Sequence, residues 1–488
     1  MTLNIEEMAT FCKKKGIIYS SSDIYGGLRG FFDYGPLGSE IKRNLVDNWW
    51  KYWVRSREDI VGIDGSIIAN PKVWKASGHV DGFSDLILET EDGEIQVRAD
   101  HFLEDELGGS FDGVSTKEVD ELVKKHNLTY KGKKFKNCFE FNMMFKTNIG
   151  PKPGNEAFLR PETAQLIFTN FKLIQENARL KLPFGIAQVG KAFRNEISPR
   201  NFIFRSREFE QLEIEYFVNP NDYSCPYITE VLDVKLNVFS ANMQKQNKEA
   251  VLMSVKEILQ KKMMLEWHAY FLAKNLKWFE GLGCNTNNFR VREHLEDELA
   301  HYSSACWDLE YKYPFGYKEL QGVANRSDHD LKKHMEHSKK DLSLFDEESK
   351  TKIVPHVIAE PSLGVDRAVL VLLYEAFLDD KKRGNILLKL SPKIAPVQVA
   401  VFPLTKKLDV KAREIYLNLK QNFTCFYDNS GSIGRRYARQ DEVGTPLCLT
   451  VDFETLDDDS VTIRDRDTTD QIRVKIKDLN KFILNKFH

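Results

Sequence analysis

The larger, N-terminal part of the chain contains stretches in which apolar and polar residues alternate with a period of two. This pattern is typical of strands with one covered face and one polar face. Two of these stretches, Phe184 to Glu196 and Arg205 to Phe217, are separated by the turn-rich segment ISPRNFIF at 197–204. The spacing predicts an antiparallel hairpin.

Two segments have the pattern of buried helices. The first begins at Gly35-Pro36, where proline suits the first helical turn. Its apolar residues recur at helical spacing: Leu37, Ile41, Leu45, Val46, Trp49 and Trp53. The second segment, Ala368 to Phe377, is apolar nearly all round, which indicates burial. Core packing is the first interpretation of the tryptophan-rich stripe, and a dimer interface is the second.

The chain divides near residue 385. The polar stretch DDKKRGN at 379–385 closes the apolar helix, and two prolines follow it. We predict a large domain at 1–384, a linker at 385–391 and a small domain at 392–488. The small domain is predicted to be α/β, with a helix at 407–422 and strands at 397–402, 447–453, 461–464 and 472–476.

The large domain has two predicted insertions, at about 82–150 and 220–300. Within them, 115–137 is lysine-rich and predicts a surface segment. The stretch 227–280 is polar-rich with few glycines and predicts a helical insertion.

Composition narrows the class of protein. With 42% hydrophobic and 29% charged residues in 488, the chain is an ordinary folded protein. Its longest apolar run, 368–374, is far short of the roughly 20 residues that span a bilayer. The N-terminus has no secretory pattern, and the seven cysteines contain no CxxC. We therefore expect a cytoplasmic protein without disulfides or a structural zinc site. The formal charge of −2 leaves nucleic-acid binding undecided.

The predicted hairpin carries an unusual polar face. Arg205, Arg207, Phe209, Gln211 and Glu213 share one face of the second strand, and Gln188, Arg194 and Glu196 share one face of the first. One interpretation is a solvated sheet face. The other is a phosphate clamp with an aromatic ring on which a base stacks, because arginines suit phosphate.

Three further strand-like stretches repeat this mixture. Phe158 to Ala164 places Arg160 and Glu162 on one face, 354–362 places Glu360 beside Ser362, and a short run ends at Arg98. Each carboxylate alone is a surface residue in the simplest interpretation. Together they predict a sheet whose polar face forms the base of a ligand-binding site.

The buried helix begins with Asp366 and Arg367. An arginine at this position needs an anionic partner, because an unpaired buried charge is costly. An internal salt bridge to a glutamate and a bound phosphate are the two alternatives.

Familiar nucleotide and hydrolase motifs are missing from the sequence. It has no GxxxxGK[ST], no GxGxxG, no nucleophile elbow and no HExxH. The histidines at 79, 101, 301 and 356 are scattered and predict no ligand set.

Longer motifs resemble those of class II aminoacyl-tRNA synthetases. FRNE at 193–196 with REFEQLEIE at 207–215 resembles motif 2, GVDR at 364–367 resembles motif 3, and the helix after Pro36 resembles motif 1. Five longer stretches resemble the dimeric, single-polypeptide glycyl-tRNA synthetases. They are DYGPLG (33–38), RPETAQ (160–165), FRNEISPRN (193–201), HYSSACWDLEYKYPFGYKEL (301–320) and EPSLG (360–364). GRRYARQDEVGTP at 434–446 resembles the anticodon-binding domain of the glycyl, threonyl, prolyl and histidyl enzymes. The resemblance covers essentially the whole chain and is weakest in 115–137 and 227–280.

The resemblance implies an α+β fold: an antiparallel sheet core flanked by helices, with a C-terminal α/β anticodon-binding domain. It also implies a cytoplasmic homodimer. The activity would be that of a glycine–tRNA ligase, which forms glycyl-adenylate and pyrophosphate from glycine and ATP with Mg²⁺. The glycine would then pass to the 3′ end of its tRNA.

The resemblance also assigns residues. The ATP-binding set is Arg194, Asn195, Glu196, Phe204, Arg205, Ser206, Arg207, Glu208, Phe209, Glu319, Leu320, Gly364, Val365, Asp366 and Arg367. The glycine-binding set is Arg98, Glu162, Phe209, Glu210, Gln211, Leu212, Glu213, Glu360, Pro361, Ser362, Leu363 and Gly364. The anticodon candidates are Arg435, Arg436 and Arg439.

Individual roles follow from the same resemblance. Arg194, Arg367 and Glu319 are the implied catalytic residues, and Glu319 is also the implied magnesium ligand. Arg194 would hold the α-phosphate on the side of the glycine carboxylate, Arg205 would contact the phosphates, and Arg367 would hold the far phosphate. Glu196 would meet the adenine edge, and Phe209 would stack on adenine.

Alternatives stay open for function and for the tail. A catalytically silent, synthetase-like nucleic-acid-binding protein would be expected to lose part of the ligand face, and nothing is lost here. An enzyme for threonine, proline or histidine is disfavoured by the glutamates and by YPFGYKEL at 313–320. In the tail, an internal ion-pair network with Asp441 and Glu442 competes with tRNA binding, most closely at Arg439.

Overall fold

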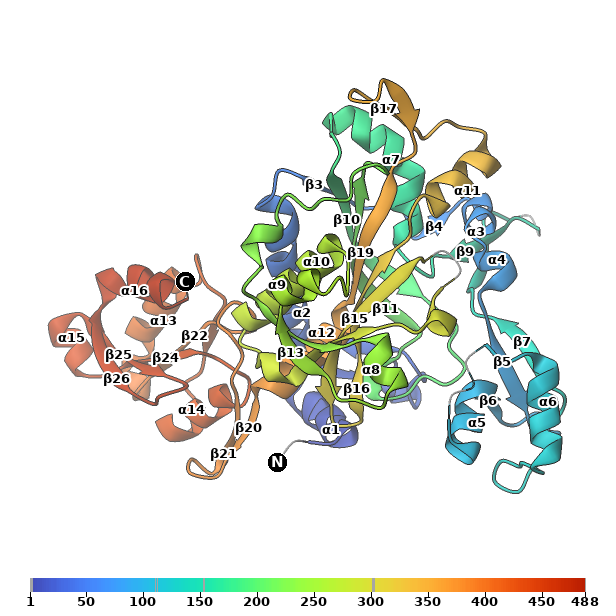
Figure 1. Cartoon of the computed structure of the whole chain (residues 1–488). Coiled ribbons are helices and arrows are strands. Elements are labelled where there is room, and N and C mark those ends of the chain that lie inside the picture. Colours follow the sequence, from blue (N-terminus) through green and yellow to red (C-terminus); the bar gives the residue numbers. More distant parts are fainter. Residues whose placement is uncertain (1–2, 110, 112, 152–153, 301–302, 488) are drawn as a thin grey trace.

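A nine-stranded sheet forms the centre of the larger part of the protein (Figure 1). The computed structural model describes residues 3–109, 111, 113–151, 154–300 and 303–487. The strand order is β13-β12-β14-β15-β16-β19-β11-β10-β3. Every neighbouring pair is antiparallel except β12 with β14 and β10 with β3. The predicted antiparallel sheet core is confirmed. The strands are β3 (Ile60–Ile63), β10 (Phe184–Phe193), β11 (Glu208–Val218), β12 (Lys235–Phe239), β13 (Val251–Ser254), β14 (Phe289–Glu293), β15 (Ala305–Tyr313), β16 (Gly316–Asn325) and β19 (His356–Gly364).

Helices α2 (Pro36–Trp50), α10 (Glu266–Gly281) and α12 (Val365–Ala376) pack against one face of this sheet. Strand β11 shows how the alternation divides the two faces. Leu212, Ile214 and Tyr216 belong to the core cluster with these helices, which leaves Gln211 and Glu213 on the opposite face.

Both buried helices begin as predicted. In α2, the residues Ile41, Leu45 and Trp49 are at most 1% exposed and lie in the core. This observation supports core packing, the first interpretation of the stripe.

On the opposite face, α7 (Ala164–Ala178) covers one end of the sheet, where Phe171 lies 4.5 Å from Phe217 between ring centroids. The other end of that face carries the polar residues of the hairpin.

The first predicted insertion is a separate lobe with its own small core. It pairs β5 (Ser84–Glu89) with β6 (Gln96–Arg98) and β7 (Phe139–Asn142), next to α5 (Ala99–Leu107) and α6 (Thr116–Lys125). Figure 1 shows it at the lower right, away from the main sheet.

The prediction of a helical insertion at 227–280 is wrong. This stretch contributes strands β12 and β13 to the central sheet and ends in α10. Helix α10 is a core helix, with Trp267, Phe271 and Phe279 fully buried.

The C-terminal part is the predicted α/β domain (red in Figure 1). Its sheet order is β23-β22-β24-β25-β26, with cores on both faces. The strands are β22 (Val399–Pro403), β23 (Cys425–Tyr427), β24 (Leu447–Val451), β25 (Ser460–Asp465) and β26 (Gln471–Lys475). The helices are α13 (Asp409–Leu419), α14 (Ile433–Asp441), α15 (Glu454–Asp458) and α16 (Leu479–Phe487).

The predicted linker is not free chain. Residues 385–388 form β21 (Asn385–Leu388), which pairs with β20 (Phe377–Asp380), so the polar stretch is the turn of a hairpin. None of the described helices is both long and apolar enough to cross a membrane.

Candidate active site

The hairpin of β10 and β11 is shorter than its sequence pattern predicted. Strand β10 ends at Phe193, and β11 begins at Glu208. Arg194, Glu196 and Arg205 therefore lie in the connecting loop, where the Arg194 N–H still donates to the Arg207 carbonyl at 2.9 Å. The functional side chains sit at the end of the sheet rather than along one strand.

The register brings distant residues together at this end of the sheet. Glu213 of β11 is paired with Ser362 of β19, and Ser362 is also opposite Gly322 of β16. Gly322 lies next to two carboxylates. A Cβ at this position would lie 3.6 Å from Asp308 Oδ1 and 3.9 Å from Glu319 Oε1.

A cavity of about 240 Å³ opens at this place. Most of the residues implied for ATP line it, together with four implied for glycine: Phe209, Gln211, Ser362 and Gly364. The lining residues are Arg194, Glu196, Ile203, Phe204, Arg205, Ser206, Phe209, Gln211, Glu319, Leu320, Ser362, Gly364, Asp366 and Arg367.

Arginines and aromatic rings form the walls of this cavity. The Arg194 guanidinium lies 5.3 Å from the centroid of the Phe209 ring, and that of Arg367 lies 4.6 Å from the Phe204 ring. Arg367 NH1 is 3.1 Å from Glu319 Oε2. The sequence left an internal salt bridge of Arg367 as one alternative, to one of the glutamates on the predicted strands; the observed partner is Glu319 instead. Both partners line the cavity.

Behind the cavity lies a buried acidic pocket. Its five carboxylates, each at most 7% exposed, belong to Glu162, Glu213, Glu215, Asp330 and Glu360. Within the described part of the chain, the basic side chains that form ion-pair contacts with them are those of Arg326 and His79. A cationic ligand would balance this excess of negative charge.

Arg326 organises the acidic pocket. Its NH1 donates to Glu360 Oε1 at 2.9 Å, and its Nε donates to Asp330 Oδ2 at 2.7 Å. Glu213 Oε1 accepts hydrogen bonds from Ser362 Oγ at 2.6 Å and from Gln211 Nε2 at 2.8 Å. Since Ser362 and Gln211 also line the cavity, their hydrogen bonds connect Glu213 of the acidic pocket to the wall of the arginine-lined cavity.

The environment separates the proton affinities of these carboxylates. Burial raises the pKa of Glu213 and raises that of Glu360 to about 8. Burial would also raise the pKa of Glu162, but the neighbouring His79 and Arg326 lower it below its usual value. Without a further cation, part of the pocket is protonated at neutral pH.

This leads to a pH prediction. A carboxyl whose pKa is raised from 4.5 to about 8 on folding binds more protons in the folded state between those two values. The free energy of unfolding should therefore fall as pH rises through that window, and less steeply in Glu360→Gln. Thermal unfolding at several pH values would measure this, and parallel profiles for the wild type and the variant would contradict it.

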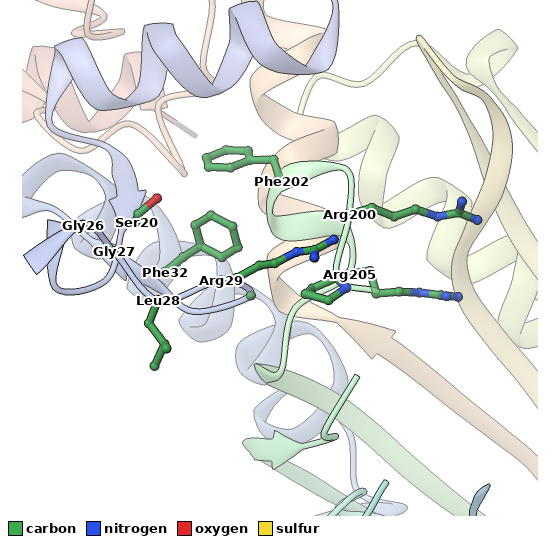
Figure 2. A pocket seen from close by; sticks show the side chains of 11 residues that line it. Ser20, Gly26, Gly27, Leu28, Arg29, Phe32, Arg200, Phe202 and Arg205 are labelled. Carbon is green, nitrogen blue, oxygen red and sulfur yellow. The ribbon is translucent and has the colours of Figure 1, made fainter. Parts of the chain in front are cut away.

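A second cavity, of about 350 Å³, adjoins the first one. Figure 2 shows its lining, with the side chains of Arg29, Arg200 and Arg205 on one side. Arg205 lines both cavities. Arg29 and Arg200 are exposed, and no carboxylate among the described residues forms an ion pair with either of them or with Arg205. This cavity suits an anion that enters from solvent.

Several predicted site residues lie elsewhere. Leu212, Leu363 and Val365 are fully buried in the core, so only their backbone atoms are in a position to meet a ligand. Glu208 pairs with Lys191, and Glu210 pairs with Lys42 at 2.5 Å.

Four more predicted residues do not line the cavity. Arg98 contacts Asp100 and lies 3.3 Å from Asp85, both in the first insertion. Arg207 Nε donates to the Glu196 carbonyl at 2.7 Å, so it supports the loop. The Asn195 N–H donates to the Met143 carbonyl at 2.8 Å, and Pro361 is buried.

Two residues of the site were missed. Nothing in the sequence pattern marked Arg326, and His79 was treated as a scattered histidine. Their positions depend on packing against Glu162 and Glu360, which are distant in the sequence.

The predicted anticodon arginines differ in exposure. Arg435 is exposed, whereas Arg436 is 3% exposed and its NH1 donates to the Pro403 carbonyl at 2.7 Å. The assignment of Arg436 as an RNA contact is therefore wrong, since its guanidinium holds backbone inside the domain. Arg439 is half-exposed and lies 3.1 Å from Asp428, not from the two acids that the sequence suggested.

A search for family models finds two matches in this chain. Residues 145–376 match the tRNA synthetase class II core domain (G, H, P, S and T), and residues 398–486 match the anticodon binding domain. A solved structure, prolyl-tRNA synthetase from Cryptosporidium parvum complexed with L-proline and AMP, shares the fold with a TM-score of 0.57. It covers 99% of this chain and 78% of that chain at 13% identity, so the likeness concerns the fold alone.

Relatives similar over their full length are more specific. The chain is 43% identical to glycine–tRNA ligase of Clostridium acetobutylicum and 42% identical to that of Caldanaerobacter subterraneus subsp. tengcongensis. Each alignment covers 99% of this chain and 98% of the relative. The glycine–tRNA ligase of Geobacillus thermodenitrificans is 40% identical over 100% of this chain and 98% of its own. The resemblance seen in the motifs is thereby confirmed, and the chain belongs to the glycine–tRNA ligase family of class II aminoacyl-tRNA synthetases.

Proposed function

We propose that the protein activates glycine with ATP to glycyl-adenylate and pyrophosphate, and then transfers the glycine to the 3′ end of its tRNA. The observation that carries this proposal is that the two parts of the site are neighbours. A cluster of buried carboxylates is hydrogen-bonded, through Gln211 and Ser362, to the wall of a cavity lined by arginines. An ammonium group fits the first, and phosphates fit the second.

The arginines would supply most of the electrostatic stabilisation during glycine activation. When the glycine carboxylate attacks the α-phosphorus, negative charge builds on the phosphoryl oxygens. Arg194 and Arg205 would stabilise this charge, and Arg367 would hold the far phosphate. No nucleophilic side chain is needed, because positioning and electrostatic stabilisation lower the barrier. Phe209 would offer its ring to the adenine, and Glu196 would meet the adenine edge.

Selection of glycine would rest on exclusion. No amino acid is smaller, so the pocket has only to reject side chains. Carboxylates of Glu162, Glu213 and Glu360 around the α-carbon would leave no room for a methyl group. Rejection by a clash is not bound by the limit of about 1–3 kcal/mol on sensing a missing methylene.

Glu319 is suited to coordinate a magnesium ion that binds together with ATP. Its carboxylate is half-exposed on the wall of the cavity, and Mg²⁺ commonly uses one or two carboxylates together with substrate phosphates. When bound, Mg²⁺ would neutralise phosphate charge, and Glu319 would hold it in place.

The tRNA would use two surfaces. Phosphates of its acceptor end suit the basic cavity of Arg29 and Arg200, and the C-terminal domain would contact the anticodon. The homodimer and the cytoplasmic location implied by the resemblance belong to this proposal. The exposed apolar side chains of Ile24 and Tyr25, which are 88% and 86% exposed, support a partner at that loop.

The C-terminal arginines give a contrasting prediction. Arg435→Ala should raise the KM for tRNA and reduce the salt slope of charging by about one, because one phosphate contact is lost. Arg436→Ala should instead lower the free energy of unfolding by about 1–3 kcal/mol, since buried carbonyls lose their donor. Charging assays at several salt concentrations and thermal unfolding would separate the two effects. A change in tRNA affinity for Arg436→Ala at unchanged stability would contradict this division.

The function is tested by ATP–pyrophosphate exchange with glycine, alanine, serine, threonine, proline and histidine in separate reactions. We expect exchange with glycine alone. A protein that had kept only nucleic-acid binding would bind tRNA without supporting exchange, and exchange with threonine, proline or histidine would overturn the choice of substrate.

A further inference from the structure

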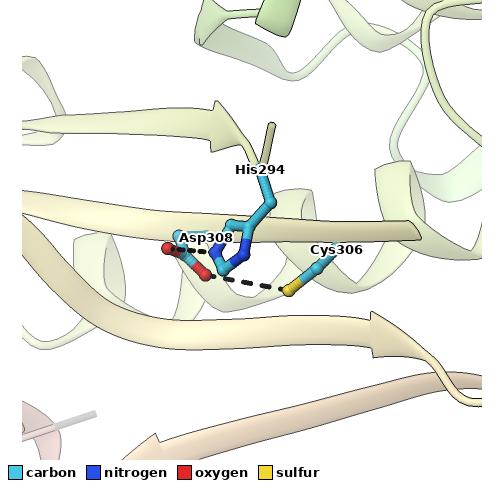
Figure 3. A group of neighbouring side chains, drawn as sticks. All are labelled: His294, Cys306 and Asp308. Atoms are coloured by element: carbon cyan, nitrogen blue, oxygen red, sulfur yellow. Dashed lines mark hydrogen bonds and ion pairs between the residues drawn. The ribbon is translucent and has the colours of Figure 1, made fainter. Parts of the chain in front are cut away.

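Three side chains with metal-ligating atoms meet on strands β14 and β15, outside the set of residues used above. His294 directly follows β14, and Cys306 and Asp308 are two residues apart on β15, so their side chains share one face. The two strands are paired beside them, and the His294 N–H donates to the Cys306 carbonyl at 3.0 Å. Figure 3 shows the three side chains converging.

The spacing of the ligand atoms suits one ion. An imidazole nitrogen, the thiol sulfur and a carboxylate oxygen all lie within 4.8 Å of one another. His294 Nε2 is 2.8 Å from Asp308 Oδ2, and Cys306 Sγ is 4.0 Å from Asp308 Oδ1. Ligands of a tetrahedral zinc ion lie about 3.3–3.8 Å apart, given bond lengths of about 2.0–2.3 Å. Small side-chain rotations on fixed strands would reach that geometry.

The charge around the cluster favours a cation. Asp308 is 5% exposed, and among the described residues no lysine or arginine forms an ion pair with it. The nearby Arg292 is occupied by Glu298, with NH2 2.7 Å from Oε2. Gly322 on the adjacent strand has no side chain to cover Asp308, since a Cβ there would lie 3.6 Å from Asp308 Oδ1.

The kinds of ligand decide which cation fits. A thiolate and an imidazole select zinc and similar transition metals, whereas Mg²⁺ prefers oxygen ligands alone. We propose that His294, Cys306 and Asp308 bind one zinc-type divalent ion per chain, with the fourth position taken by water. This site is separate from the magnesium ion that would accompany ATP, and it does not depend on which amino acid is activated.

Such an ion would join two strands of the central sheet next to the ATP cavity. Because it would bind the folded state, whose strands bring the ligands together, it should also raise the unfolding temperature.

The test uses the full-length protein, stripped of metal by a chelator and then titrated with Zn²⁺ in competition with a coloured chelator. We expect one tight site per chain, and a rise in unfolding temperature on adding Zn²⁺ but not on adding equal Mg²⁺. Titration with Co²⁺ should give a thiolate-to-cobalt charge-transfer band in the near ultraviolet.

Variants identify the ligands. Cys306→Ser should weaken Zn²⁺ binding at least ~10-fold, since even outer-shell changes cost 10- to 100-fold, and it should abolish the cobalt band. Cys425→Ser, a half-buried cysteine in the C-terminal domain, is the matched control and should change neither. If Cys306→Ser fails to fold, His294→Asn takes its place, with loss of affinity as the readout. Equal Zn²⁺ affinity in wild type and a folded ligand variant, or a wild-type cobalt complex without the thiolate band, would overturn the proposal.

Discussion

Arg194→Ala is expected to lower kcat/KM for glycine-dependent ATP–pyrophosphate exchange at least ~10³-fold, the loss seen when an arginine is removed from a phosphoryl-transfer site. The structure gives the reason. Arg194 Nε donates to the Pro161 carbonyl at 3.1 Å, and the guanidinium stands over Phe209. No carboxylate among the described residues forms an ion pair with it. Its charge is therefore available to phosphate, and it should act mainly on the transition state.

The same experiment separates catalysis from folding. Arg194→Ala should unfold at nearly the wild-type temperature, because within the protein it loses one hydrogen bond to a backbone carbonyl and its contacts with the rings of Phe83 and Phe209, and no ion pair. Arg55→Ala, at an exposed arginine outside the site, is the matched control and should retain full exchange. An unfolded or aggregated Arg194→Ala protein would show that the residue is structural instead.

Glu213→Gln is expected to raise the KM for glycine about 10- to 150-fold, the equivalent of the 1.5–3 kcal/mol carried by a hydrogen bond to a charged group. ATP binding should stay nearly intact, because the acidic pocket lies behind the arginine-lined cavity. Glu360→Gln should act in the same direction and also release one of the Arg326 hydrogen bonds. Exchange kinetics at varied glycine with saturating ATP, and then at varied ATP, would measure both effects.

An exposed glutamate provides the control for this pair. Glu176→Gln on α7 removes a carboxylate whose contact with Lys172 is 3.7 Å long, and should leave both KM values unchanged. A loss of ATP affinity in Glu213→Gln as large as the loss of glycine affinity would show that the carboxylate serves the nucleotide or the fold.

Local patterns were enough for much of the framework. The alternation along 208–218 identified the polar face, and the apolar run after Arg367 identified a buried helix with a charge in its first turn. Four strands of the C-terminal domain also lie close to where they were predicted, whereas β23 was not predicted. Such features depend on side chains that are neighbours in the chain, so their period is visible in the sequence.

Local patterns failed where burial is decided by other segments. Helix α10 was predicted as part of a helical insertion into the large domain, although it packs against the central sheet and belongs to its core. Arg436 stands in a basic run that resembles an RNA contact, yet its guanidinium is enclosed and bonded to the Pro403 carbonyl. A basic residue has the same appearance in a sequence whether its partner is a tRNA phosphate or a backbone carbonyl.

For this protein, the sequence by itself determined the family, the fold class and most of the residues that line the arginine-rich cavity, because these are carried by contiguous motifs. Only the tertiary structure decided how charges from separate motifs combine. It placed Arg326 and His79 among the carboxylates, paired Arg367 with Glu319, and brought His294 next to Cys306 and Asp308. The physical reason is that the protonation state and the ion-pair partners of a charged side chain depend on the groups around it. Sheet pairing brings those groups together from segments far apart in the chain.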